Sequence, residues 1–193
     1  MNQLLMKWNT KDIEKTIIPE EYKEYTFTRG GDDLFSEEEF KKQWIVLCGE
    51  DTGMEPEKWF HIVYDDKRVP DDGFFCVLDS SGKIAAAAQI QLGEHTPDSA
   101  TVHAVAASEK HRGKKLGKAV TVMVMRDTYE KGIKEVYLTT DDWRTAAVNL
   151  YIRLGFMPVM YEDEMRERWT KLIKENGYEN VPIIDEDGNC SFI

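Results

Sequence analysis

One basic segment with two glycines has the residue types that hold phosphate groups. Residues 111–119 read HRGKKLGKA; they follow an apolar run at 100–107 and open a helix-period segment at 116–129. A strand, a glycine turn and a helix start in this order present unpaired N–H groups and the positive end of a helix dipole. Glycine lets the backbone approach a ligand, and four cations add charge: Arg112, Lys114, Lys115 and Lys118. We therefore interpret residues 112–118 as an anion-binding turn, called the phosphate turn below.

Three kinds of phosphate-containing ligand could in principle account for this turn. A nucleotide-binding P-loop needs four residues between its first glycine and its Gly-Lys pair, followed by Ser or Thr. Here three residues separate Gly113 from Gly117, and Ala119 follows Lys118, so we exclude this motif. A nucleic-acid surface needs an extended positive footprint, which one basic cluster in a chain of formal net charge -11 does not supply. The third ligand, the diphosphate arm of coenzyme A, is favoured by the segments downstream.

Two motifs carry a resemblance to a known family. The turn has Arg112 and Gly117 at the ends of an Arg/Gln-x-x-Gly-x-Gly/Ala pattern, with Lys115 at the middle glycine position. Downstream, residues 146–156 read AAVNLYIRLGF, similar to A-x-x-L-Y-x-x-x-G-F, and a strand candidate at 135–140 lies between the motifs. In this order the motifs resemble the GNAT-type N-acetyltransferase superfamily over roughly residues 74–159. Members often carry Asn where this chain has Arg144.

The resemblance implies an α/β fold with a mixed, mostly antiparallel central sheet flanked by helices. In that family the fourth and fifth strands splay apart; here they would be residues 100–107 and 136–140. We expect one N-acetyltransferase domain over residues 1–193. Residues 1–73 would supply the acceptor-side helices and the first strand, and residues 160–193 a C-terminal helix and tail.

The resemblance also implies acetyl-CoA as co-substrate. Pantetheine would lie between the splayed strands and pair with the backbone of Val105, Ala106 and Ala107, whose small side chains suit close approach. The phosphates would rest on the N–H groups of the turn, namely those of Arg112, Gly113, Lys114, Lys115, Leu116, Gly117 and Lys118. At Lys115 we expect a helical rather than a left-handed backbone, because a side chain replaces glycine there.

Two side chains are candidates for proton transfer. Tyr151 occupies the family's position for the acid that protonates the leaving thiolate, and a phenol of pKa ~10 suits that task. Alternatively, Tyr151 is one more aromatic residue of the apolar helix face that Leu150 and Leu154 form. His103 is the candidate base, and its place two residues before Val105 predicts a shared strand face. A structural histidine remains the alternative. The other candidate bases are Glu94, Asp141 and Asp142, the last of which also suits a helix N-cap.

These features predict transfer of an acetyl group from acetyl-CoA to a primary amine of a small molecule or peptide by direct attack. The alternative is a non-catalytic acyl-CoA-binding or sensing module on the same fold. We expect no nucleic-acid partner, and a monomer or homodimer.

Composition agrees with this interpretation. A chain of 193 residues with 41% hydrophobic residues suits one globular domain, and no apolar run approaches the ~20 residues of a membrane span. The start lacks the basic region and apolar core of a secretory signal. The three cysteines have no metal-like spacing, so we expect a cytoplasmic protein with free thiols and no metal. The 36 acidic against 25 basic residues disfavour anionic polymers and membrane surfaces.

Periodicity and turn residues predict the remaining elements. Residues 25–28 are expected to form the first strand. Ser36 with Glu39 should cap a helix that runs to about Cys48 and is stopped by Gly49. The other expected elements are a helix from Pro56, a hairpin of residues 74–78 and 84–91, a strand at 156–160 and a charged helix at 162–176. The tail from residue 181 carries weak signals.

Overall fold

The computed structural model describes residues 2–48 and 54–193, which form two compact units. Of the described residues, those within 11–134 form the central unit, and 2–10 with 135–193 form the terminal unit. Both units combine helices with antiparallel strands, so the α/β class and the mostly antiparallel strand pairing are as predicted. Among the described residues, no helix has the length and apolar character needed to cross a bilayer.

The central unit is built on four antiparallel strands. They pair in the order β2 (Lys23–Phe27), β3 (Phe74–Leu78), β4 (Ile84–Leu92) and β5 (Ser99–Ala107). The predicted hairpin of β3 and β4 is confirmed. Asp79 closes its turn by accepting the N–H groups of Ser81 at 2.8 Å and Lys83 at 3.1 Å. Such a side-chain-to-backbone bond lets a short polar segment reverse the chain.

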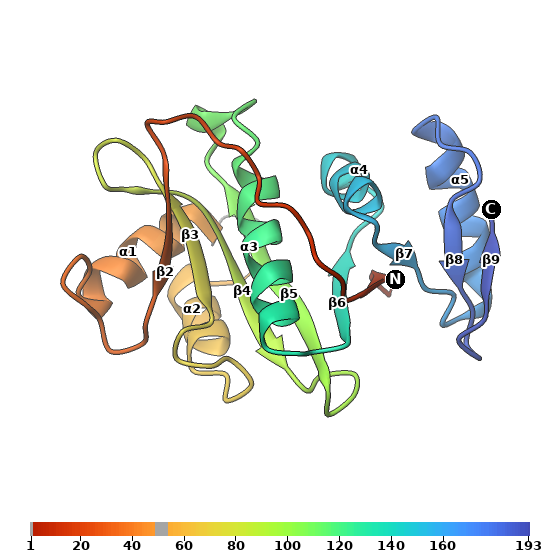
Figure 1. Cartoon of the computed structure of the whole chain (residues 1–193), viewed down its shortest axis with the longest axis horizontal. Helices are drawn as coiled ribbons and strands as arrows, with labels where there is room; N and C mark the ends of the chain where they lie inside the picture. Colours follow the sequence, from red (N-terminus) through yellow and green to blue (C-terminus); the bar gives the residue numbers. More distant parts are fainter. Residues whose placement is uncertain (1, 49–53) are drawn as a thin grey trace. The chain divides into compact units, whose positions relative to one another are not determined.

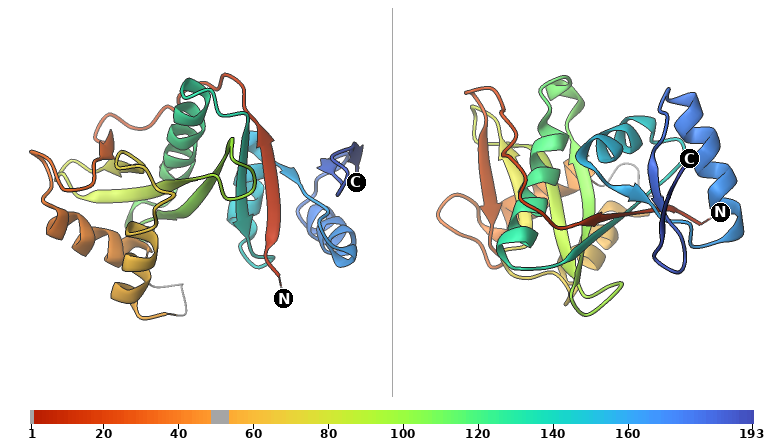
Figure 2. Two further views of the ribbon diagram at one scale, coloured as in Figure 1. Left: turned by 90° about the horizontal axis from the view of Figure 1, so that it is seen from below. Right: turned by 45° about the vertical axis from the view of Figure 1, so that its right-hand side comes forward.

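Helices cover both faces of these strands. The two views of Figure 2 and Figure 1 place α3 (Leu116–Glu130) on one face, and α1 (Glu37–Cys48) with α2 (Pro56–Tyr64) on the other. As predicted, Ser36 caps α1, accepting the N–H of Glu39 at 3.2 Å, and Pro56 is the first residue of α2. Gly49, expected to end α1, lies outside the described residues.

Aromatic side chains form the core beneath α1 and α2. Phe27 of β2 and Phe40 of α1 stack with ring centroids 3.7 Å apart, and Phe74 meets Phe40 edge-on at 5.6 Å. The same cluster contains Trp44 and Cys76, both fully buried. Dense aromatic packing of this kind fixes the position of β3 and β4 relative to the helices. The predicted free thiols are present at Cys48, Cys76 and Cys190.

The terminal unit contains the strand predicted at 135–140, a shortened form of the strand predicted at 156–160, and three described strands that were not predicted. Its sheet order is β6 (Glu135–Thr140), β1 (Leu4–Asn9) and β7 (Met157–Pro158), all antiparallel. Because β1 precedes β2, the expectation that the first strand lies at residues 25–28 is wrong. In the tail, β8 (Pro182–Ile184) and β9 (Cys190–Phe192) pair as a hairpin.

Two helices complete the terminal unit. They are α4 (Thr145–Leu154) and α5 (Asp163–Glu175), and the latter confirms the predicted charged helix at 162–176. Its acidic side chains and most of its basic ones are exposed, and Arg168 is half-buried. Its buried side chains are apolar: Met165, Trp169, Leu172 and Ile173. Helix α4 ends at Gly155, which adopts φ 90°, a left-handed conformation open to glycine at little cost.

Candidate functional site

The phosphate turn presents a set of free backbone donors. A 3-10 turn, η1 (Glu109–His111), follows β5, and α3 begins at Leu116. The N–H groups of Arg112 and Lys114 are used locally, donating to the carbonyls of Glu109 at 3.1 Å and His111 at 3.4 Å. In the part of the chain that the structure describes, five further amides of the turn have no acceptor: those of Gly113, Lys115, Leu116, Gly117 and Lys118. Of the seven N–H groups expected to hold phosphates, these five are therefore free to donate to a ligand.

Lys115 does not adopt the expected helical backbone. It is the N-cap of α3 with φ 61° and ψ 23°, in the left-handed region. The expectation was wrong because the residue precedes the first helical residue, where the chain still has to turn. An L-residue in this conformation costs roughly 1–2 kcal/mol. Lys115 thus keeps the backbone shape that glycine would give, and left-handed residues beside helical ones form concave anion sites.

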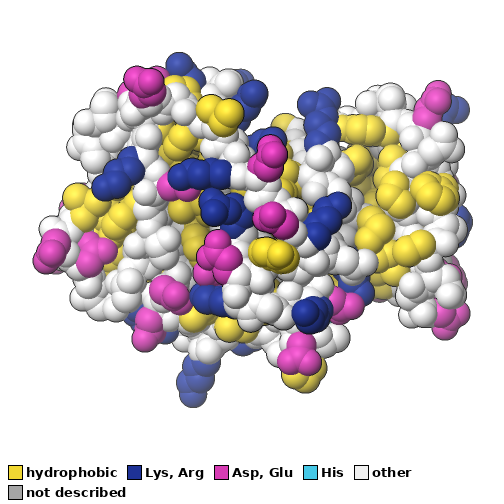
Figure 3. Space-filling model, viewed as in Figure 1, with side chains coloured by type: hydrophobic (Ala, Val, Ile, Leu, Met, Phe, Trp, Pro, Cys, Tyr) yellow, Lys and Arg dark blue, Asp and Glu magenta, His cyan; other side chains and the backbone are white. Residues whose placement is uncertain are grey.

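The four cations of the turn differ in their surroundings. Arg112 lies 3.3 Å from Glu109, and the ammonium of Lys114 lies 3.7 Å from Glu21. Lys115 and Lys118 are exposed, and neither has an acidic partner within the described ranges 2–48 and 54–193. Figure 3 shows acidic and basic side chains interspersed over the face that α3 covers. The cations best placed for a new anion are therefore those of Lys115 and Lys118.

Gly117 leaves open space between the start of α3 and the end of β5. A Cβ added to it would meet the Cβ of Ala107 at 4.0 Å, an ordinary contact. Its backbone is not in the left-handed region, so the fold itself does not demand glycine there. The missing side chain instead leaves the amides of the turn accessible.

A bulge interrupts β5 in its second half. Gln89 of β4 pairs with His103, and Ala87 pairs with Ala106, so Ala104 and Val105 together oppose one residue of β4. Ala104 adopts φ 50°. Since partners across a ladder share a face, His103 shares its face with Ala106. The expectation that His103 and Val105 share a face is therefore wrong, because the bulge shifts the alternation by one residue.

A hydrogen bond just beyond the end of β5 defines where the last peptide groups of this strand point. Ser108 donates to the carbonyl of Ala85 at 2.9 Å. Residues of an antiparallel strand direct their N–H and C=O groups alternately toward and away from the partner. Counting back from Ser108, Ala106 faces β4, whereas Val105 and Ala107 face away from it. At this end of β5, the backbone groups that β4 does not pair are thus those of Val105 and Ala107.

His103 has the protonation state that a base requires. Burial lowers its pKa below the usual 6.5; Glu94 and Asp66 oppose this shift, and Arg68 adds to it. Its Nδ1 atom is buried and has no hydrogen-bond partner among the described residues. A neutral imidazole with a free nitrogen can accept a proton.

Tyr151 is a protonated phenol in the terminal unit. Its side chain is 6% exposed, and burial raises its pKa to about 12, while Arg144 slightly opposes the shift. Its ring packs edge-on against Phe156 at 5.9 Å. Phe156 also donates its N–H to the carbonyl of Tyr151 at 3.0 Å across the glycine that ends α4. The motif at 146–156 therefore serves to orient Tyr151 as well as to close the helix.

The other candidate bases are engaged in ion pairs. Glu94 lies 3.1 Å from Arg68, and Asp141 lies 3.3 Å from Arg144. Asp142 pairs with Arg168 at 2.5 Å, whose hydrogen bond lowers the pKa of that carboxyl. The expectation that Asp142 is a helix N-cap is wrong, because α4 begins later, with Arg144 at the N-cap and no side-chain cap.

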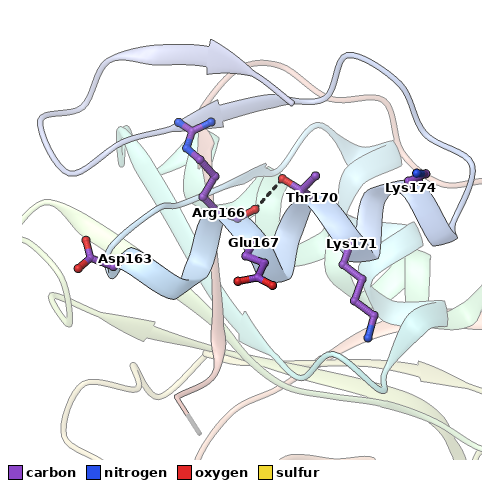
Figure 4. A pocket seen from close by; sticks show the side chains of 6 residues that line it. All are labelled: Asp163, Arg166, Glu167, Thr170, Lys171 and Lys174. Carbon is purple, nitrogen blue, oxygen red and sulfur yellow. Dashed lines mark hydrogen bonds between the residues drawn. The ribbon is translucent and has the colours of Figure 1, made fainter.

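A surface hollow of about 480 Å³ lies along α5. Figure 4 shows its lining side chains: Asp163, Arg166, Glu167, Thr170, Lys171 and Lys174. Arg166 and Lys174 point to one side of the helix, and Glu167 and Lys171 to the other. Because these groups diverge and include none of the predicted site residues, we assign no function to the hollow.

Known proteins share this sequence pattern and fold. The sequence profile described as "Acetyltransferase (GNAT) family" matches residues 32–156. The chain is 38% identical over 88 residues to a mycothiol acetyltransferase of Arthrobacter sp. (strain FB24), covering 44% of this chain and 27% of that protein.

Two solved structures show the same fold. A GCN5-related N-acetyltransferase from Sphaerobacter thermophilus matches with a TM-score of 0.61 at 20% identity, over 81% of this chain and 48% of that one. A diaminobutyrate acetyltransferase from Paenibacillus lautus, solved with L-2,4-diaminobutyric acid and coenzyme A, matches with a TM-score of 0.51 at 15% identity, over 69% of this chain and 74% of that one. This chain thus spans about half the length of the first of these structures, and its match covers about a quarter of the mycothiol acetyltransferase.

Proposed function

Because the chain belongs to the acetyltransferase (GNAT) family, we propose that it transfers an acetyl group from acetyl-CoA to a primary amine of a small molecule or peptide. The observation that carries this proposal is the row of five free amides in the phosphate turn, with Lys115 in a glycine-like conformation. Backbone donors at a helix start suit a diphosphate, as do two lysines that have no acidic partner among the described residues.

The residues of the central unit suit coenzyme A along its length. The free amides and the side chains of Lys115 and Lys118 would hold its phosphates. The outward peptide groups of Val105 and Ala107 offer a donor and an acceptor edge for the amides of pantetheine. The thioester supplies an activated acetyl group, and a backbone N–H aimed at its oxygen would stabilise the negative charge of the transition state.

The proposed transfer forms one bond and breaks one. The nitrogen of a neutral amine attacks the thioester carbonyl carbon, so that a C–N bond forms and the C–S bond breaks. His103, directly or through water, accepts the proton that the amine loses. The phenol of Tyr151 gives its proton to the departing thiolate and recovers one from solvent.

A thiol-release assay tests this proposal. Purified protein is incubated with acetyl-CoA and a panel of amines, and free thiol and acetylated amine are quantified together. Amine-dependent release of thiol with equal acetylated product supports the enzyme. Saturable acetyl-CoA binding without release from any amine would instead support the alternative, a non-catalytic acyl-CoA-binding module.

A further inference from the structure

A cluster of polar side chains lies on the α2 face of β4 and β5, apart from the phosphate turn. The strand register pairs Gln89 with His103 and Gln91 with Thr101, so these four side chains are neighbours on one face. The side-chain amide of Gln89 donates to the carbonyl of Val63 in α2 at 3.2 Å, which identifies that face. Three charged residues adjoin the four, and all seven are called the polar cluster: Asp66, Arg68, Gln89, Gln91, Glu94, Thr101 and His103.

Three buried atoms of the polar cluster lack hydrogen-bond partners among the described residues. They are Oε1 of Gln89, Oγ1 of Thr101 and Nδ1 of His103. Gln89 is 0% exposed and Thr101 is 3% exposed, so solvent reaches neither freely. A buried polar atom without a hydrogen-bond partner destabilises the fold. All three atoms can accept a hydrogen bond, so the strand face that carries them favours ligands with N–H and O–H donors.

The charges of the cluster favour a cation. The guanidinium of Arg68 contacts Asp66 at 2.6 Å and Glu94 at 3.1 Å, so that two carboxylates share one cation. Gln91 donates to Asp66 at 3.2 Å. One negative charge is left in excess, and the guanidinium is already occupied by the cluster's own carboxylates. An ammonium is attracted to such a site, whereas a carboxylate meets two like charges and no free cation.

We propose that the polar cluster binds the acceptor, and that the acceptor is a primary amine with further hydrogen-bond donors and no carboxylate. Its ammonium lies against Glu94 and Asp66 on arrival. Its other donors lie toward the strand face that carries Gln89 and Thr101. The amine nitrogen comes next to Nδ1 of His103, one residue before the bulge of β5. This inference rests on the proposed function, since it identifies the amine class of that reaction.

Matched pairs of ligands test the inference directly. Each pair is an amine and the amino acid that adds only a carboxylate: 2-aminoethanol with serine, cadaverine with lysine, and tyramine with tyrosine. Binding is measured by calorimetry on the whole protein, with and without saturating coenzyme A. We expect the amine of at least one pair to bind about tenfold more tightly than its amino acid. Equal or tighter binding of the amino acid in every pair would overturn the inference.

A pair of variants localises the binding. Glu94→Gln removes the partly exposed charge of the cluster, and Asp98→Asn removes an exposed charge from the same hairpin loop outside it. We expect Glu94→Gln to weaken binding of the preferred amine at least fivefold, and Asp98→Asn to leave it within twofold. Equal effects of the two changes would contradict the assignment. A separate measurement of acetyl-CoA affinity distinguishes this inference from the proposed function. If acetyl-CoA does not bind, the acetyltransferase proposal fails even where amines bind the polar cluster.

Discussion

The carbonyl of Lys115 accepts the N–H of Ala119 at 3.0 Å, while Lys115 itself stands in a left-handed backbone conformation. The residue therefore closes the first turn of α3 from a strained position. This relationship keeps the following amides directed outward, away from any helical acceptor. A glycine would do the same without steric cost, so the lysine side chain is retained at the expense of stability.

Replacing Lys115 separates strain from charge. Lys115→Gly and Lys115→Ala remove the same ammonium, but only glycine relieves the strain of the left-handed backbone, which is roughly 1–2 kcal/mol. Glycine also gives the unfolded chain more conformational freedom, which offsets about 0.4–1 kcal/mol of this gain in stability. We expect the glycine variant to be more stable than the alanine variant by up to about 1.6 kcal/mol in urea unfolding. An alanine variant more stable than the glycine variant would show that the turn relaxes in solution.

Gly117→Ala should damage binding without damaging the fold. The added Cβ meets only Ala107, at an ordinary 4.0 Å, and alanine favours a helix over glycine by up to about 1 kcal/mol. We therefore expect unchanged or higher stability, but at least tenfold weaker acetyl-CoA binding, a loss of about 1.4 kcal/mol. Gly113→Ala is the contrasting control, since φ 82° makes it destabilising. If Gly117→Ala binds acetyl-CoA with wild-type affinity, the open space beside Gly117 has no role in binding.

Tyr151→Phe tests the proton donor. The ring contact with Phe156 is kept, so the free energy of unfolding should change little. Loss of a general acid lowers turnover by about 10²–10⁴-fold, and we expect a fall in kcat within this range with an unchanged acetyl-CoA Kd. Because burial raises the pKa of Tyr151 to about 12, wild-type activity should show no alkaline loss from this group below pH 10. Full turnover in the variant would refute the assignment.

The sequence alone predicted most of the elements because their signals are local. Ser36 capping α1, Pro56 opening α2 and the Asp79 turn all act within a few residues of themselves. The alternation of Leu4, Met6 and Trp8, all buried in β1, was also a readable strand signal, and it was overlooked. The short β8 and β9 had too few residues to show a period.

Features that depend on pairing could not be derived from the chain. The bulge at Ala104 appears only when β4 and β5 are aligned, and it moves His103 to the face of Ala106. Asp142 lies where the sequence suggests a helix N-cap, but its carboxylate forms an ion pair with Arg168, which is far along the chain. The left-handed backbone of Lys115 could not be predicted either, because the geometry of the turn overrides the preference of lysine for a helical backbone.

His103 should make stability depend on pH. Its pKa is lowered by burial below the unfolded value of 6.5, so the unfolded chain binds more protons in the window just below that pH. Stability should therefore fall as pH drops through that window, and His103→Gln should flatten the fall. His95, whose pKa burial also lowers, contributes in the same direction in both proteins, so the difference between them isolates His103. Parallel pH–stability curves would contradict a buried, neutral His103.

The most direct test of the central claim, that the phosphate turn holds the diphosphate of coenzyme A, is titration calorimetry with two ligands. Acetyl-CoA carries the diphosphate and nucleotide, and S-acetylpantetheine carries the same thioester without them. We predict saturable, micromolar-range binding of acetyl-CoA, weakened by salt, and at least tenfold weaker binding of S-acetylpantetheine. Equal affinities for the two ligands, or no binding of acetyl-CoA, would contradict the account.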